Sequence, residues 1–366
     1  MWWLLARIAI SGGLLAWLVH GLNLATIVQR LLHASWGWLL LANLLTAPVI
    51  VLVSWKWQIL LRAAGVRETL PRLVRMNLVG GFYSLVLPGE ETGQLAKGVI
   101  LARHSRGDAV AASIIVDEIL GTLSIFSIAL AALALVSPFP LRPIIAGALA
   151  FMLAVFLVLL VLAVLPRCHG LARAILRRQL PWLNAALVWL LVPLPVRGLA
   201  PKAAPGLERR LERARFRFVA WLEPFWERLG DYHQRPGSLV AAFGITVAAH
   251  LLANVSVLGT MRAGGVGLDF INICWFVAAV SALVTIPITV SGFGIREGAN
   301  VVLLAQFGVP RDQALVVSTL AFAIGFVWSL PGALLQFGIR SKTPARPPTA
   351  PEEPGAVEAA AGGGAS

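Results

Sequence analysis

The chain has 366 residues, of which 58% are hydrophobic and only 13% charged. Soluble domains carry about 25% charged residues. The mean hydropathy of +0.82 and apolar runs of about 20 residues, long enough to cross a bilayer, exclude that class. The net charge of +13 does not indicate nucleic-acid binding, because the basic residues gather in loops beside apolar runs and no nucleic-acid motif stands out. Cys168 and Cys274 are too few for a disulfide framework or a metal cluster, and no cofactor is expected.

The apolar runs predict an all-α, polytopic membrane helix bundle of six or seven spans. A first span at residues 4–22 is expected to be retained, since no small-residue cleavage site follows it. Further spans are predicted at residues 36–61, 109–136, 144–165, 239–261 and 314–337. Lys56 lies near the end of its span, and we expect its flexible side chain to reach the interface.

The chain between the second and third spans is predicted to enter the membrane and turn back. The run Met76–Leu87 is too short to cross, it breaks at Pro88–Gly93, and a second half continues to Ala102. This pattern predicts a re-entrant hairpin, because broken helix is tolerated in hydrocarbon only where protein or a polar cavity surrounds it. The elbow and the residues after it supply the candidates Pro88, Gly89, Glu90, Glu91, Gly93, Gln94 and Lys97.

A second break follows the fifth span and carries an adjacent arginine and glutamate. Its elbow residues are Pro287, Gly292, Gly294 and Gly298, with Arg296 and Glu297 between the last two. Arginine suits bidentate contact with a lipid phosphate, and the alternative is a buried ion pair that fixes the elbow. Residues 270–308 are interpreted as a second hairpin. The alternative is that residues 270–290, a run of 21, cross fully and place the chain end on the other side.

Other charged residues at membrane depth are functional candidates by default. Glu90 and Glu91 could accept from a cationic headgroup or pair with Arg296. Lys97 could be a ligand, or could reach the interface as Lys56 is expected to do. Asp117 and Glu118 lie deeper in the third span, where proton coupling competes with a structural role.

The large loop at residues 166–238 holds 13 Lys or Arg and 5 acidic residues, which predicts a cytoplasmic location. Within it, Pro205–Gly230 has the apolar spacing of an amphipathic helix, lying either on the protein's own surface or in the headgroup layer. Leu180–Pro195 is expected at the interface. We predict one transmembrane domain over residues 1–340 and a disordered tail over 341–366.

A shift of 205 residues aligns the two broken regions and suggests an internal repeat. The aligned identities are Gly89 with Gly294, Gly93 with Gly298, Arg106 with Arg311, Ala109 with Ala314, and Ser113 with Ser318. Two hairpins that enter from opposite faces would form an inverted repeat, with the binding site at the discontinuous helices. Helix amino termini near Gly93 and Gly298 would suit a phosphate.

The run from Pro287 to Gly298 (PITVSGFGIREG), extended by Phe307–Pro310, closely resembles a signature of the lysylphosphatidylglycerol synthase transmembrane (flippase-like) family. The family's earlier motif reads like Pro-Gly-x-x-Gly-Glu-x-x-Arg. Here Gly93 is followed by Gln94 and Lys97, so an amide replaces a carboxylate and a lysine replaces an arginine. Asp117-Glu118 stands where the family often has an acidic residue and an arginine.

The resemblance implies a membrane region linked to moving an aminoacylated phospholipid between leaflets, with aminoacyl transfer assigned to a separate soluble domain. We therefore expect no enzymatic activity from this chain. We predict a multi-pass protein of the bacterial inner membrane that binds and flips an anionic phospholipid or lipid-linked molecule, with no nucleic-acid partner. The alternative is a scaffold that anchors a lipid-synthesis enzyme or glycosyltransferase, and the oligomeric state stays open.

Overall fold

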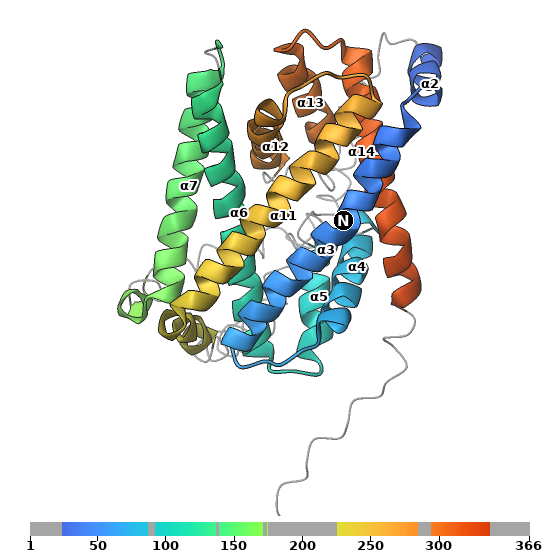
Figure 1. The fold of residues 1–366 in the computed structure, drawn as a ribbon. Helices are drawn as coiled ribbons and strands as arrows, with labels where there is room; N and C mark the ends of the chain where they lie inside the picture. Colours follow the sequence, from blue (N-terminus) through green and yellow to red (C-terminus); the bar gives the residue numbers. More distant parts are fainter. Residues whose placement is uncertain are drawn as a thin grey trace, which may run out of the picture.

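The computed structural model describes residues 24–86, 92–136, 139–170, 174, 225–284 and 294–336, and every regular element in these ranges is helical (Figure 1). The all-α class is therefore confirmed for this part of the chain. Several predicted features lie outside the described residues: the span at 4–22, both hairpin tips (87–91 and 285–293), most of the basic loop and the tail.

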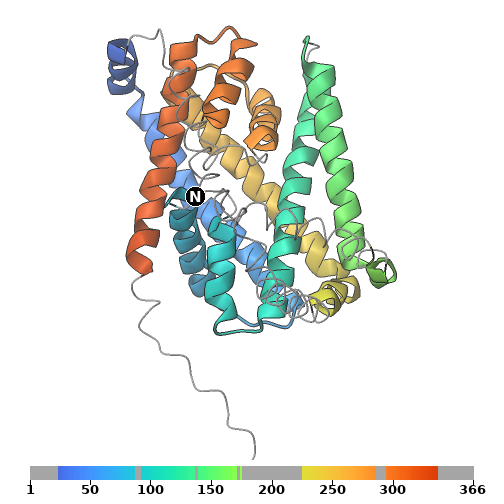
Figure 2. The same cartoon turned by 180° about the vertical axis from the view of Figure 1, so that it is seen from behind.

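Five of the described helices are long and apolar enough to cross a membrane. They are α3 (Trp36–Ala63), α6 (Gly107–Leu135), α7 (Arg142–Val164), α11 (Pro236–Ala263) and α14 (Arg311–Leu335). Each begins and ends within three residues of a predicted span, because uninterrupted apolar runs define both. The views from both sides place α6 and α7 as a neighbouring pair on one side of the bundle and α14 on the other (Figures 1 and 2).

Four shorter helices occupy the two regions predicted to break. They are α4 (Leu70–Val86) with α5 (Thr92–Ala102), and α12 (Phe270–Val284) with α13 (Ile295–Ala305). The first pair lies in the lower half of the bundle in Figure 1 and the second pair in the upper half. A short helix that sequence analysis did not predict, α2 (Leu24–Leu32), packs beside α14, where Arg30 Nε lies 2.8 Å from Asp312 Oδ2.

The centre of the bundle is an antiparallel pair formed by α3 and α11. Ser35 N–H donates to Ala263 O over 3.1 Å, so the start of α3 meets the end of α11. At the opposite end, the Arg235 guanidinium donates to Ala63 O over 3.2 Å. Gly259 sits so close to Ala42 and Trp38 that a side chain there would crowd both, which lets the two helix backbones approach.

The two central helices also end in the same turn. Gly65 and Gly265 have φ angles of 84° and 76°, a region that glycine adopts without steric cost. Their N–H groups donate to Arg62 O and Arg262 O over 3.1 Å each, and Val66 and Val266 donate to Leu61 O and Met261 O over 2.8 Å each. This six-to-one pattern satisfies carbonyls left free at a helix end. The chain thus leaves α3 and α11 in the same geometry.

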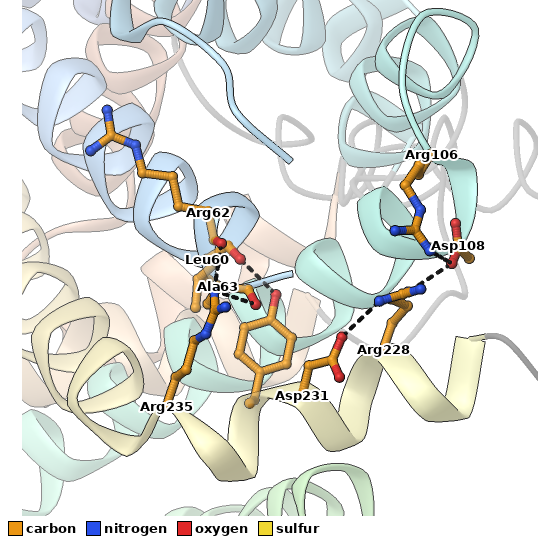
Figure 3. Close-up of polar contacts among 9 residues, drawn as sticks. Leu60, Arg62, Ala63, Arg106, Asp108, Arg228, Asp231 and Arg235 are labelled. Carbon is orange, nitrogen blue, oxygen red and sulfur yellow. Dashed lines mark hydrogen bonds and ion pairs between the residues drawn. The ribbon is translucent and has the colours of Figure 1, made fainter. Parts of the chain in front are cut away.

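Residues 225–235, just before α11, hold one end of the bundle together. We call it the basic end, because Arg62, Arg106, Arg228 and Arg235 lie there (Figure 3). Arg228 pairs with Asp108 at the start of α6 and with Asp231, each over 3.0 Å. The fully buried Tyr232 donates its hydroxyl to Leu60 O over 2.9 Å. Burial first, and the charges of Asp117 and Asp231 second, raise the pKa of Tyr232, so the phenol stays a donor.

Residues 225–230 are the described end of the predicted amphipathic helix, and they are helical. Phe225 and Leu229 are buried in the apolar cluster that also contains Trp57 and Leu61 of α3. These residues therefore pack on the protein's own bundle.

Replacing Tyr232 with phenylalanine should lower the free energy of unfolding by about 1 kcal/mol, the usual net value of one hydrogen bond. The cost stays small because Leu60 O also accepts from Ala64 N–H. Unfolding in detergent mixtures would measure it. Tyr83→Phe is the matched control, since the Tyr83 hydroxyl makes a longer, part-buried bond to Gln336 Oε1 at 3.2 Å. A larger loss at Tyr83 than at Tyr232 would contradict the expectation.

Candidate functional site

A cavity of about 560 Å³ opens inside the bundle, between α3, α4, α5, α6, α11 and α12. We call it the ion-pair cavity. Its charged and titratable lining residues are Lys56, Lys97, Asp117, Glu118 and His250. Four of the residues predicted for a binding site are therefore brought together here: Gln94, Lys97, Asp117 and Glu118.

Lys56 and Asp117 form a buried ion pair on the wall of this cavity. Lys56 Nζ lies 2.9 Å from Asp117 Oδ1, and the two side chains are only 7% and 3% exposed. The expectation that Lys56 reaches the interface was therefore wrong. The packing of α3 against α6 places the Asp117 carboxylate within reach of the Lys56 ammonium inside the bundle. Asp117 Oδ1 lacks a well-directed hydrogen-bond donor among the described residues, which makes the contact chiefly electrostatic.

Lys97 also points inward, so of the two alternatives considered for it, the one in which its side chain reaches the interface is wrong. It is 2% exposed. Its Nζ donates to Asn77 Oδ1 over 3.0 Å and lies 4.5 Å from the centre of the Trp57 ring, where a cation is attracted to the π face. The Trp57 ring is fixed in turn, because its Nε1 donates to Ser113 Oγ over 3.1 Å. Lys97 is thus a positioned cation at the cavity.

Gln94 and Gly93 follow the first elbow and have different roles. The buried Oε1 of Gln94 finds no hydrogen-bond partner among the described residues. Gly93 packs against Gly80 and Ser84 of α4 so closely that a Cβ would overlap both. Close packing between α4 and α5 therefore explains Gly93, where the sequence favoured elbow geometry. The other first-elbow candidates, Pro88, Gly89, Glu90 and Glu91, lie outside the described residues.

A second cavity, of about 540 Å³, lies between α4, α11, α12, α13 and α14 and contains Arg296 and Glu297. We call it the arginine cavity. Gly81 and Ser84 of α4 and Ser281 of α12 line both cavities, so the two adjoin. Asn300, also in the lining, donates to Ser318 Oγ over 2.7 Å.

Glu297 holds the start of α13. Its Oε2 accepts from Gly294 N–H over 2.7 Å, an acidic side chain that reaches back to the helix start. Gly294 has φ of 87°, as a true elbow residue requires. Gly298 has open space around it, and Pro287 and Gly292 lie outside the described residues. Arg296 and Glu297 thus reach the same cavity, and Glu297 supports the helix that carries Arg296.

Sequence reasoning missed several polar residues of the ion-pair cavity. They are Lys56, Asn77, Ser84, Thr246, His250 and Ser281. The His250 ring lies against the Gly121 backbone of α6. Asn254, one turn on, contacts Cys274 Sγ of α12 at 3.4 Å. The available signal was helical spacing: His250 and Thr246 lie four residues apart on one face of α11.

The site combines cations, carboxylates and amides deep within helices that could span a membrane, so it can hold a polar or charged group away from lipid. Among the described residues, no group of three or more His, Cys, Asp or Glu side chains could hold a metal ion.

Comparisons with known proteins agree with the motif at residues 287–298. The chain matches the family described as "Lysylphosphatidylglycerol synthase TM region" over residues 4–332. No curated protein and no solved structure matched the chain significantly. The matched region spans all five long helices and both cavities, and it identifies a multi-pass membrane protein. The chain belongs to the family of lysylphosphatidylglycerol synthase transmembrane regions.

Proposed function

We propose that this protein binds a lipid with a charged headgroup and moves it between the two leaflets of the membrane. The observation that carries the proposal is the Lys56–Asp117 pair, buried yet on the wall of a cavity of about 560 Å³ inside the spans. Charges are costly at this depth and are retained where they act on a substrate or ion. The adjoining arginine cavity extends the polar region toward the other end of the bundle.

The architecture proposed for this activity is an inverted repeat. In it, α4 with α5 and α12 with α13 are re-entrant hairpins that enter from opposite faces. Their placement in opposite halves of the bundle (Figure 1), the antiparallel α3–α11 pair and the matching turns at Gly65 and Gly265 support this arrangement. Sites at the broken helices of such repeats are common in secondary transporters.

The distribution of basic residues indicates how the protein is oriented in the membrane. We propose that the basic end faces the cytoplasm of a bacterial cell, because the loop at 166–238 carries 13 basic and 5 acidic residues. Arg62, Arg106, Arg228 and Arg235 lie together at this end (Figure 3).

The substrate class we propose is an anionic phospholipid or a lipid-linked phosphate, and the protein acts as a carrier and not as a synthase. Arg296 suits a phosphate because a guanidinium presents paired donors in a fixed plane. The start of α13 adds backbone N–H groups and the positive end of a helix dipole beside it.

Replacing Arg296 with alanine should reduce lipid movement by about tenfold, the loss expected when a charge-assisted hydrogen bond of about 1.4 kcal/mol is removed. The assay would use proteoliposomes with fluorescent phosphatidylglycerol, whose exposure on each leaflet is read by a membrane-impermeant quencher. Arg142→Ala is the matched control, since Arg142 begins α7 outside both cavities. It should leave the rate unchanged.

Two results would contradict the proposal: equal rates for Arg296→Ala and wild type, or no lipid movement by a folded, inserted protein. The second result would favour the alternative, in which the basic loop anchors a lipid-synthesis enzyme or glycosyltransferase. Deleting residues 205–224 would then abolish the partner's recruitment.

A further inference from the structure

A lipid carrier has to compensate the charge of the headgroup that enters the ion-pair cavity. Its described lining holds two lysines, Lys56 and Lys97, and two carboxylates, Asp117 and Glu118. With the lysines and carboxylates ionised and His250 neutral, the described part of the lining is electrically balanced. An anionic headgroup that enters would leave one excess negative charge inside the bundle, where an uncompensated charge is costly.

The Lys56–Asp117 contact can open to accept such a headgroup. Both residues line the cavity, so a phosphate held inside it would lie beside the pair. The contact is also poorly directed as a hydrogen bond. A phosphate that binds Lys56 would take from Asp117 the cation that neutralises it.

Asp117 would then need another neighbouring group to compensate its negative charge. Five helices pack against α6, and their facing groups are few. Lys56 faces Asp117 from α3, Lys97 lies across the cavity on α5, and His250 faces it from α11. Among the described lining residues, α12 contributes the neutral Ser281, α7 contributes none, and α6 adds Glu118. At the basic end, Tyr232 interacts electrostatically with Asp117.

None of these groups can take the place of Lys56, whose Nζ lies 2.9 Å from Asp117 Oδ1. Lys97 is held by Asn77 and the Trp57 ring, and Tyr232 donates to Leu60 O. A carboxylate left in this position without Lys56 would be an uncompensated buried charge, and binding a proton neutralises it.

We propose that Asp117 is a proton-binding site coupled to the lipid: each anionic headgroup that binds Lys56 releases Asp117, which then takes one proton from water. The charges balance, since one negative charge and one positive charge enter together. When the headgroup leaves, Asp117 returns its proton to water and pairs with Lys56 again. The inference rests on the proposed function and adds to it a proton that moves with the lipid.

The experiment compares wild type with Asp117→Asn in proteoliposomes that contain fluorescent phosphatidylglycerol and a trapped pH-sensitive dye. Wild type should carry about one proton for each lipid, and a pH gradient should drive the lipid. Asparagine imitates the protonated carboxyl and still offers an oxygen to Lys56. Asp117→Asn should therefore move lipid at a rate that does not vary with pH, without a dye signal.

Two variants control for loss of structure. Asp108→Asn makes the same change on the same helix, at the basic end and outside both cavities, and it should behave as wild type. Asp117→Glu keeps a titratable carboxyl and should keep the proton signal. A folded Asp117→Asn protein that moves no lipid would contradict the inference, because a purely structural pair predicts that result.

A measurement on wild type alone keeps the inference testable if Asp117→Asn does not fold. Calorimetry of short-chain phosphatidylglycerol binding, in two buffers of different ionisation enthalpy, counts the protons taken up directly. The phosphodiester itself does not titrate near neutral pH. Uptake of about one proton supports the inference, and uptake of none overturns it. Lipid movement without protons would overturn the inference alone, whereas no lipid movement at all would overturn the proposed function as well.

Discussion

Replacing Lys56 with methionine should lower the free energy of unfolding by about 3–5 kcal/mol, because Asp117 would lose its buried cation and would have to stay charged or be neutralised by a proton without its partner. Both side chains are below 10% exposed, so water cannot substitute for the missing ammonium. The double variant Lys56→Met with Asp117→Leu should recover most of the loss, since two apolar residues replace the pair. Asp117→Asn should cost less, because Lys56 keeps an acceptor.

Unfolding in detergent mixtures would give these values, and the exposed pair Arg30–Asp312 supplies the comparison. Its side chains are 42% and 21% exposed, and exposed pairs contribute below about 1 kcal/mol. Arg30→Met should therefore be close to wild type. If the double variant were no more stable than Lys56→Met, the buried charge would not be the cause of the loss.

Replacing Gly332 with alanine should cost about 3 kcal/mol, at the upper end of overpacking effects. A Cβ at this position would overlap the Leu78 carbonyl and lie 3.1 Å from Phe82 Cβ, so α14 would have to move away from α4. Pro331 precedes Gly332 within α14, and the helix hydrogen bonds there have little freedom to adjust.

Gly325→Ala is the control, because it makes the same change two turns earlier on the same helix, where no atom lies within 4 Å. It should stabilise α14 by up to about 1 kcal/mol, the difference in helix propensity between alanine and glycine. Thermal unfolding followed by Trp fluorescence would compare the two variants. Equal melting temperatures would show that α4 and α14 are not held at the distance described.

The long helices could be predicted from the sequence because one property, an unbroken apolar run, decides where they begin and end. The short pairs were predicted for the same reason, since Pro and Gly interrupt the runs. The directions of Lys56 and Lys97 could not be predicted. A lysine near a span end can extend to water or to a polar group inside the bundle. Only the packing of α3 against α6 places Lys56 beside Asp117, and only the packing of α5 against α4 places Lys97 beside Asn77.

The candidate site was predictable where charge alone marks it, as for Asp117, Glu118 and Arg296. Asn77 and Ser84 were missed, because polar uncharged residues in apolar helices often only hold helices together. The predicted internal repeat has a further match that one fixed shift does not include. The sequence Arg62-Ala-Ala-Gly65-Val66 matches Arg262-Ala-Gly-Gly265-Val266 at a shift of 200 residues. A single shift of 205 misses this match, because the second break is longer than the first.

The tight packing of α3 on α11 has a mechanical consequence. Ser256 Oγ donates to Ala42 O over 2.7 Å, one turn from the crowded contact at Gly259. Sliding one helix along the other would break this bond and drive Gly259 into a larger neighbour. The two helices therefore resist sliding along each other, and the pair acts as a rigid unit at the centre of the bundle. A motion that opens one cavity while closing the other would then have to move the helices packed around this rigid pair, such as α4 with α5 and α12 with α13.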